Sequence, residues 1–501
     1  MSTTLNSASL QGLEALPIAV EADIQRGLPK FTIVGLPDTA VQEARERVRS
    51  AIINSGFRFP DSRVTVNLAP ASIKKAGGSF DLPIAASIVI TNLHKIGTSL
   101  DRYLFLGELS LSGRVRKVPG VLSVIMMAKK LGYQKIFVPD NNSYEAALIK
   151  GLDIIPLNNL HQLIEYLTKR QNIKPLSYRP IRITEPQWQV DFNNIKGQFQ
   201  AKRALEISAA GGHNVRLVGP PGSGKTMLSQ ALLSILPSPN ESEALEITRL
   251  YSVAGKLIDQ ELKTTRPFRQ PHHTASPAAV IGGGSNPKPG EISLAHRGVL
   301  FLDELPEFPR DVIEALRQPL ENGFISVSRV ANTVKYPARF ILIAAHNPCP
   351  CGWFGDSGTS CRCTPHQLIQ YNKKLSGPLL DRIDLTISVP RVKFNELVDE
   401  YDGEDSLTIR QRVLHARKLQ ATRYKNSDIQ NNSEMDIKLL NKFCLLDTEI
   451  KEVLKQAVNE LNLSARSVHR LLKVSRTIAD LFDQDKINVK HVTEALQYRN
   501  R

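Results

Sequence analysis

The sequence predicts an α/β protein of two or three domains, with a parallel sheet in the middle part of the chain. The 501 residues are more than one hydrophobic core usually holds. Four near-continuous apolar stretches, VRLVG, GVLFLDE, FILIAAHN and DLTISV, alternate with helix-like segments, as strands buried on both faces of a sheet do. Composition also changes at RQNIKPLSYRPIRITEPQWQ and again near Pro390. We therefore expect an N-terminal domain (residues 1–169), a linker (170–192), an α/β core (193–392) and a C-terminal domain (393–501).

The N-terminal domain is predicted to mix strands and helices. Strand-like runs occupy residues 16–23, 30–36, 63–70 and 135–140, and residues 103–118 have the pattern of a hairpin. A helix is predicted over residues 38–56, because apolar residues recur on one of its faces: Val41, Ala44, Val48, Ala51 and Ile52.

The C-terminal domain is helical in pattern. Ser464 is suited to cap the N-terminus of a helix, whose apolar face would contain Val468, Leu471, Leu472, Ile478 and Leu481. The chain contains no internal repeat and no low-complexity tract.

Composition indicates a soluble protein with a basic surface. Hydrophobic residues make up 42% and charged residues 23%, as in ordinary globular proteins. No apolar run is long enough to cross a bilayer, and the N-terminus lacks the pattern of a signal peptide. We expect a cytoplasmic protein without a membrane partner. The net charge of +15 favours polyanionic partners, although basicity can also serve solubility alone.

A phosphate-binding loop is predicted at GPPGSGKT. The motif follows the apolar strand VRLV and precedes a helical run, which is the context that such a loop requires. Its glycines allow backbone N–H groups to surround phosphates, Lys225 would reach the β- and γ-phosphates, and the Thr226 hydroxyl can bind Mg²⁺. The alternative interpretation is an ordinary glycine-rich turn. The predicted nucleotide-binding residues of the loop are Gly219, Pro220, Pro221, Gly222, Ser223, Gly224, Lys225 and Thr226.

Two carboxylates end the next predicted strand, GVLFLDE. Ligands bind at the carboxyl ends of strands in open α/β sheets. Asp303 is expected to hold Mg²⁺, and Glu304 is expected to polarise the attacking water. Asn347, at the end of FILIAAHN, is placed to orient that water and to sense the γ-phosphate; alternatively it forms a turn at the strand end.

Two arginines are candidates for contact with the nucleotide. Arg382, in GPLLDRIDL, would act as an arginine finger on the nucleotide of a neighbouring subunit, unless it forms a local ion pair with Asp381 or Asp384. Arg466 is a candidate second sensor, and Arg470, one turn further on, is its rival.

Four of the five cysteines lie in PCPCGWFGDSGTSCRC, residues 348–363. Cys349, Cys351, Cys361 and Cys363 would bind a structural Zn²⁺ as four thiolates. Two disulfides or buried free thiols are the alternatives. A closed four-sulfur site leaves no position for catalysis by the metal.

The motifs together resemble the AAA+ ATPases of the magnesium chelatase and MCM branch. Four stretches are especially similar to the ComM/YifB group of bacterial magnesium-chelatase-like ATPases: DFNNIKGQFQAKRALEISAAGGHNVRLVGPPGSGKT, FRQPHHTASPAAVIGGG, NPCPCG and YNKKLSGPLLDRIDL. The resemblance spans the chain. It implies an AAA+ phosphate-loop core with a helical C-terminal lid, ATP bound between the subunits of a hexamer, and ATP-driven DNA branch migration during homologous integration of taken-up DNA. Single-stranded, double-stranded or branched DNA and recombination proteins are the partners it implies.

In this branch a hairpin commonly points into the ring pore, and residues 323–340 have the corresponding position here. Arg329 would lie near its tip and Lys335 on the returning arm, where both would contact DNA phosphates. The alternative is a basic surface hairpin without a ligand. The stretch PHHTASPAAVIGGG, with His272 and His273, would be a second pore-facing insert, and adjacent histidines in a loop do not by themselves indicate a metal.

The cysteine segment also carries aromatic and basic residues that suit stacking on DNA. These are Trp353, Phe354 and Arg362. The two aromatic side chains could equally pack within the segment itself.

The N-terminal domain resembles the Lon protease domain and its ribosomal-protein-like relatives, through FLGELSLSGRVRKVPGV and KKLGYQKIFVPDNN. Asp81 stands where the Lon serine would be and Leu122 where its lysine would be, while Ser79 and Lys129 are out of register. The domain is therefore expected to be a scaffold or a DNA-contact module without peptidase activity.

Three functions compete. A DNA motor agrees with the charge, the hairpin and the resemblance. A subunit of a chelatase that inserts Mg²⁺ into a porphyrin is the alternative, but it requires neither the Lon-like domain nor the cysteines. An ATP-dependent protease would lack its catalytic serine and lysine.

Overall fold

A seven-stranded sheet forms the N-terminal domain in the computed structural model of the chain. The model describes residues 2–93, 99–183, 185, 188–257, 262–284, 287–329, 332–356, 358–375, 377–392, 403–425, 427 and 429–499. The strand order is β3 (Lys30–Val34), β4 (Arg63–Ala69), β2 (Glu14–Gln25), β1 (Ser2–Gln11), β5 (Tyr103–Phe105), β8 (Lys135–Pro139) and β9 (Asp153–Leu157).

Helices cover both faces of this sheet. The helices of the domain are α1 (Thr39–Asn54), α2 (Asp81–Leu93), α3 (Val121–Lys130), α4 (Ser143–Ala146) and α5 (Leu160–Leu167). Phe105 and Phe137 point into a core with α1, α2 and α5, whereas their neighbours Leu104 and Ile136 point into a second core with α3. This alternation follows from the two-residue repeat of a strand.

The predicted strands, helix and hairpin of this domain are found, and the structure adds strands β1 and β9 and helices α2 to α5. All five predicted apolar residues of α1 are fully buried, and the expected hairpin is the pair β6 (Glu108–Leu109) and β7 (Val115–Arg116). Strand β1 was not predicted. Its sequence STTLNSASLQ has no clear apolar alternation, and it is held by antiparallel pairing with β2 along its whole length.

The core sheet consists of five parallel strands, in the order β11 (Phe268–Arg269), β14 (Val299–Leu302), β17 (Ile341–His346), β10 (Val215–Val218) and β18 (Leu385–Ser388). Val299 and Phe301 lie in one hydrophobic core, and Leu300 and Leu302 lie in another. The sheet is therefore buried on both faces, as its continuous apolar strands predict. The two-residue strand β11 was not predicted.

Helices pack on each side of the core sheet. They are α6 (Phe199–Gly211), α7 (Lys225–Ile235), α8 (Glu241–Val253), α9 (Pro277–Ile281), α10 (Glu291–Leu294), α11 (Arg310–Ala315), α12 (Arg317–Asn322), α13 (Pro365–Lys374) and α14 (Gly377–Leu380). Two short hairpins accompany them: β12 (Gly282–Gly283) with β13 (Lys288–Pro289), and β15 (Phe324–Arg329) with β16 (Asn332–Pro337).

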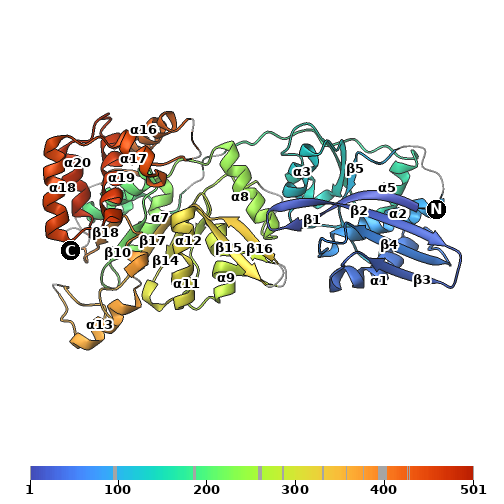
Figure 1. Ribbon diagram of the computed structural model, residues 1–501, viewed down its shortest axis with the longest axis horizontal. Coiled ribbons are helices and arrows are strands. Elements are labelled where there is room, and N and C mark those ends of the chain that lie inside the picture. Colours follow the sequence, from blue (N-terminus) through green and yellow to red (C-terminus); the bar gives the residue numbers. More distant parts are fainter. Residues whose placement is uncertain are drawn as a thin grey trace.

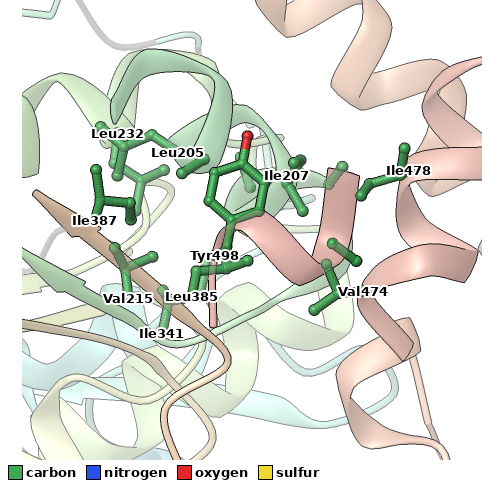
Figure 2. Close-up of a cluster of buried hydrophobic side chains, with 14 of the residues drawn as sticks. Leu205, Ile207, Val215, Leu232, Ile341, Leu385, Ile387, Val474, Ile478 and Tyr498 are labelled. Carbon is green, nitrogen blue, oxygen red and sulfur yellow. The ribbon is translucent and has the colours of Figure 1, made fainter. Parts of the chain in front are cut away.

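The C-terminal helices share a hydrophobic core with the sheet. They are α16 (Ser406–Arg423), α17 (Ile437–Phe443), α18 (Thr448–Leu461), α19 (Ala465–Leu481) and α20 (Val489–Gln497). Figure 2 shows Val474, Ile478 and Tyr498 beside the strand residues Val215 and Leu385. The Ser464 side chain caps α19 as predicted, by accepting a hydrogen bond from the Ser467 N–H.

The N-terminal domain contacts the core at α8 and at the β15–β16 hairpin (Figure 1). The Arg249 guanidinium donates to the Ser123 hydroxyl (2.9 Å) and to the Leu13 carbonyl (2.6 Å). Gly12, in the turn between β1 and β2, lies against Val334 so closely that a Cβ there would be 2.2 Å from Cγ1 of Val334. The hairpin is thus in direct contact with the N-terminal domain.

Among the described residues, no helix combines the length and the apolar character of a membrane span.

Candidate functional site

The segment GPPGSGKT forms a loop between β10 and α7. Gly222 and Gly224 have positive φ values of 74° and 87°, which favour glycine. A Cβ on either residue would have nothing within 4 Å. The space above these two glycines is therefore open, which suits the close approach of a phosphate to the backbone.

Lys225 connects the loop to the end of a neighbouring strand. Its Nζ donates to the carbonyls of Gly219 (2.8 Å) and Pro220 (2.9 Å) and lies 3.3 Å from Oδ1 of Asn347. Burial lowers the pKa of the Lys225 ammonium. A buried cation held mainly by carbonyl oxygens is ready to exchange them for phosphate oxygens.

Of the two carboxylates after β14, Asp303 faces the start of α7. The Thr226 hydroxyl lies 3.4 Å from Oδ2 of Asp303, and the backbone N–H of Glu304 donates to Oδ1 of Asp303 (3.0 Å). A hydroxyl and a carboxylate are the hard oxygen ligands that Mg²⁺ prefers. This donor set fits the ion expected beside a nucleotide.

Glu304 has an unusual backbone conformation and an unpredicted partner. Its φ is 52° and its ψ is 46°, a left-handed conformation that is uncommon for residues other than glycine. Its Oε2 lies 3.2 Å from Nδ1 of His273, and the His273 ring lies 4.2 Å from that of His272. Sequence reasoning missed this contact, because nothing in PHHT indicates a partner some thirty residues away.

Asn347 is positioned by a buried pair behind it. Nε2 of His346 accepts a hydrogen bond from Nε of Arg216 (2.9 Å), so the ring proton is on Nδ1, which donates to the Asn347 carbonyl (2.6 Å). Burial, with the charge of Arg216, lowers the pKa of His346 to about 4. The imidazole therefore stays neutral and keeps this tautomer at neutral pH.

The four predicted cysteines lie together. All four sulfur atoms are within 4.8 Å of one another, and Cys349, Cys351 and Cys361 are separated by 3.3 to 3.7 Å. Backbone hydrogen bonds from Arg362 and Trp353 lower the pKa of Cys351 to about 6. The thiols are free, so the disulfide alternative does not describe this structure. Four sulfurs at this spacing fit a tetrahedral Zn²⁺ site.

The cysteine segment touches the phosphate loop. Gly352 has a φ of 86°, and a Cβ on it would be 2.6 Å from Cδ of Pro221. The Trp353 ring lies 4.1 Å from the guanidinium of Arg391, whereas the Phe354 side chain is 54% exposed and Arg362 is exposed. Of the two aromatic residues, Trp353 therefore packs against the protein and Phe354 faces solvent.

Arg382 lies at the opposite edge of the sheet, before β18. It is largely buried and forms an ion pair with Glu321, not with Asp381 or Asp384 as the predicted local alternative had it. Its Nε is buried without a hydrogen-bond partner among the described residues. Asp384 pairs instead with Arg470 (2.9 Å).

Arg466 lies beside Arg382. Its side chain is 70% exposed, and its Nη1 is 3.7 Å from the same Glu321 carboxylate. Strand β10 separates this edge of the sheet from the phosphate loop by about 13 Å, at about 3.3 Å per residue. Arg466 is therefore not placed to contact a nucleotide on its own chain's loop.

Residues 323–340 form the antiparallel hairpin β15–β16, in which Val334 is buried and Lys335 is exposed, with its Nζ 5.0 Å from the Phe324 ring. The side chain of Arg329 lies outside the described residues. Tyr336 lies on the same face as Val334, and its hydroxyl donates to the Pro287 carbonyl (2.6 Å), next to β13.

In the N-terminal domain, the two positions aligned with the Lon dyad have structural contacts. The Asp81 carboxylate pairs with Nε of Arg47 (3.0 Å) and accepts from the Leu109 N–H (3.2 Å). Leu122 is fully buried.

Most of the chain matches families of the magnesium chelatase subunit ChlI. Residues 191–397 match the family described as magnesium chelatase, subunit ChlI, residues 20–142 match subunit ChlI of Mg-chelatase, and residues 403–499 match its ChlI C-terminal family.

Two relatives match this chain over nearly its full length, and a third matches less than half of it. The chain is 45% identical over 489 residues to the uncharacterized protein YifB of Escherichia coli, covering 97% of this chain and 95% of the relative. It is 42% identical over 498 residues to the competence protein ComM of Haemophilus influenzae, covering 98% and 96%. The magnesium-chelatase 38 kDa subunit of Cereibacter sphaeroides is 24% identical over 261 residues, covering only 45% of this chain.

The contact between the cysteine segment and the phosphate loop generates a prediction. Gly352→Ala would push Pro221 and is expected to weaken binding of a fluorescent ATP analogue about tenfold, which corresponds to about 1.4 kcal/mol. Titration of the labelled nucleotide measures the effect.

Gly355→Ala is the matched control. Gly355 also has a positive φ, of 79°, but a Cβ on it would meet nothing within 4 Å. Equal affinity losses in both variants would mean that backbone strain in the segment, rather than its contact with Pro221, affects the nucleotide.

Proposed function

The chain belongs to the ComM/YifB family of magnesium-chelatase-like AAA+ ATPases, and we propose that it is an ATP-driven DNA motor that promotes branch migration when taken-up DNA recombines. One observation carries the proposal. The cysteine segment and the loop that contains His273 both contact the edge of the sheet where the nucleotide would bind. Gly352 of the cysteine segment lies against Pro221, and His273 contacts Glu304. Changes at the nucleotide can therefore reach both segments through direct contacts.

The residues at this edge are suited to hydrolysing ATP. Lys225 and the backbone of residues 219–226 would hold the phosphates, and Thr226 and Asp303 would hold Mg²⁺, which neutralises phosphate charge when bound. Glu304 would accept the proton of the attacking water. Asn347 would orient that water, since its side chain already lies beside Lys225.

A ring of subunits is supported by the placement of the arginines. Arg382 and Arg466 lie at the amino ends of the strands, away from their own phosphate loop, and the Nε of Arg382 is buried without an acceptor in the part of the chain that the structure describes. In a ring, both would face the nucleotide of a neighbour and neutralise the charge that develops on its γ-phosphate. We infer a hexamer from the family resemblance.

The hairpin is proposed to contact DNA in the pore. A series of contacts connects the nucleotide site to the hairpin. Glu304 contacts His273, and α9 and Gly282 follow His273 in the sequence. A Cβ on Gly282 would be 3.3 Å from the Val327 side chain of the hairpin. Lys335 and Arg329 would bind DNA phosphates, and Phe354 and Arg362 would add a stacking contact. The N-terminal domain would serve as a scaffold, because it rests on the same hairpin at Val334.

The test of the proposed function is ATP turnover by the full chain with and without four-way-junction DNA at moderate salt. Junction DNA is expected to bind, to stimulate turnover and to be branch-migrated. Glu304→Gln is expected to lower hydrolysis about 100-fold or more, with ATP binding retained, because it removes a general base. Glu307→Gln is the matched control, since Glu307 pairs with Lys374 at the surface.

Two outcomes would contradict the motor. If junction DNA neither binds to the protein nor changes its ATP turnover, the protein is not a DNA motor. Insertion of Mg²⁺ into a porphyrin, dependent on ATP and unaffected by DNA, would establish the chelatase alternative instead.

The contact of His273 with Glu304 yields a second prediction. While Nδ1 of His273 holds the carboxylate, Glu304 is less available to the attacking water. His273→Ala is therefore expected to raise turnover without DNA several-fold and to reduce the ratio by which DNA stimulates it. His272→Ala, which removes the neighbouring ring but not the contact, should leave both values near those of the wild type. If basal ATP turnover and its stimulation by DNA are both unchanged in His273→Ala, then His273 does not limit the availability of Glu304.

The cysteine cluster yields a third prediction. Purified protein is expected to contain one equivalent of zinc per chain by elemental analysis, because four thiolates complete a tetrahedral shell. Cys361→Ser should lose most of the metal, while Cys444→Ser, at a buried site outside the cluster, should retain it. Protein without zinc, or equal zinc in both variants, would contradict the assignment.

A further inference from the structure

A cavity of about 450 Å³ lies at the amino edge of the core sheet, facing the C-terminal helices. It is lined by the residues that precede β10, β14 and β18, by the first residue of β17, and by side chains of α16 and α19. The phosphate loop is at the opposite edge and does not line it. The cavity is thus separate from the nucleotide site of the same chain.

Most cations that line the cavity have a carboxylate partner. Arg266 pairs with Glu243 (2.9 Å), Arg339 with Glu434 (2.7 Å) and Arg470 with Asp384 (2.9 Å). Arg297 pairs with Glu246 (3.0 Å), and Arg466 lies 3.7 Å from Glu321. Asp436 is a further carboxylate of the lining, and it accepts a hydrogen bond from the N–H of Leu439.

Two lining cations have only backbone carbonyl partners among the described contacts. Arg417 donates through Nε (2.9 Å) and Nη2 (2.7 Å) to the Ala209 carbonyl, and Nζ of Lys473 donates to the Ser433 carbonyl (2.9 Å). In the described part of the chain, neither forms an ion pair with a carboxylate. Nη1 of Arg417 and two protons of Lys473 are not used by these bonds.

Both side chains are half-buried, which raises the cost of their charges. Their partial burial lowers the pKa of Arg417 to about 10 and lowers the pKa of Lys473. A half-buried cation that forms no ion pair is suited to bind an anion from outside the chain. The other lining residues include apolar side chains, such as Leu236, Phe340 and Met435, and a volume of this size is typical of small-molecule sites.

We propose that the cavity binds a phosphate-bearing small molecule, with its phosphate oxygens on Arg417 and Lys473 and its remaining part on the apolar wall. A phosphate presents several acceptor oxygens, and its negative charge suits a lining that contains seven Lys or Arg side chains and five Asp or Glu side chains. The inference goes beyond the proposed DNA motor, and it shares with it Arg466, which lines the cavity and which the proposed function places opposite the nucleotide of a neighbour.

The test uses the full chain carrying Lys225→Ala, so that the phosphate loop no longer competes for the ligand. Isothermal titration with inorganic pyrophosphate and, separately, with ADP is expected to show binding. Arg417→Met and Lys473→Met, each added to that background, should weaken the binding about tenfold or more, the effect of losing one charged hydrogen bond. Lys418→Met removes an exposed charge from the adjacent position and should leave the affinity unchanged.

The two ligands distinguish the source of the phosphate. Binding of pyrophosphate alone identifies a free polyphosphate, and tighter binding of ADP identifies a nucleotide. If Arg417→Met does not fold, the affinity of Lys473→Met alone tests the proposal, because the Lys473 side chain makes a single hydrogen bond, to the Ser433 carbonyl. Absence of binding by both ligands, or binding that neither substitution weakens relative to Lys418→Met, overturns the proposal.

Discussion

The parallel register of β10, β17 and β14 determines where every group of the nucleotide site lies. Val218 pairs with His346, and Leu302 pairs with Ala344. Consequently Gly219, Asn347 and Asp303 leave their strands at the same edge, on neighbouring strands about 5 Å apart. The register is fixed because alternate residues of each strand enter two different hydrophobic cores, and a slip of one residue would exchange the two faces. The hydrophobic packing therefore positions the polar groups.

Sequence reasoning found the features that are encoded locally. Four core strands were visible as apolar runs, the α1 face as a helical repeat, and the cap of α19 as Ser464 before an amphipathic segment. The phosphate loop and the cysteine cluster are short motifs and were located from spacing alone. Strand β1 was missed because pairing with β2, rather than an apolar pattern, makes it a strand. The contacts of Glu304 with His273 and of Arg382 with Glu321 were missed because each joins residues far apart in the sequence.

The hairpin β15–β16 contacts two other parts of the chain, the β12–β13 segment and the N-terminal domain. Val327 and Tyr336 contact the β12–β13 segment, which follows the loop whose His273 contacts Glu304. On the same face of the hairpin, Val334 meets Gly12 of the N-terminal domain. A hairpin held at both arms moves as a unit with its supports, because packed side chains transmit displacement with little compression. Its position is thus determined jointly by the nucleotide edge and by the N-terminal domain.

The amino edge of the sheet carries an excess of guanidinium groups that the chain stabilises only in part. Glu321 is close to both Arg382 and Arg466, and its side chain is 39% exposed. A single carboxylate shared by two arginines orients both without neutralising them, and Arg382 retains a buried Nε that has no acceptor among the residues described. Leaving a buried donor unsatisfied costs about 1–3 kcal/mol, a cost that an anion approaching from outside the chain would remove. The isolated subunit is therefore electrostatically incomplete at this edge, which is the physical argument for a neighbour that supplies negative charge there.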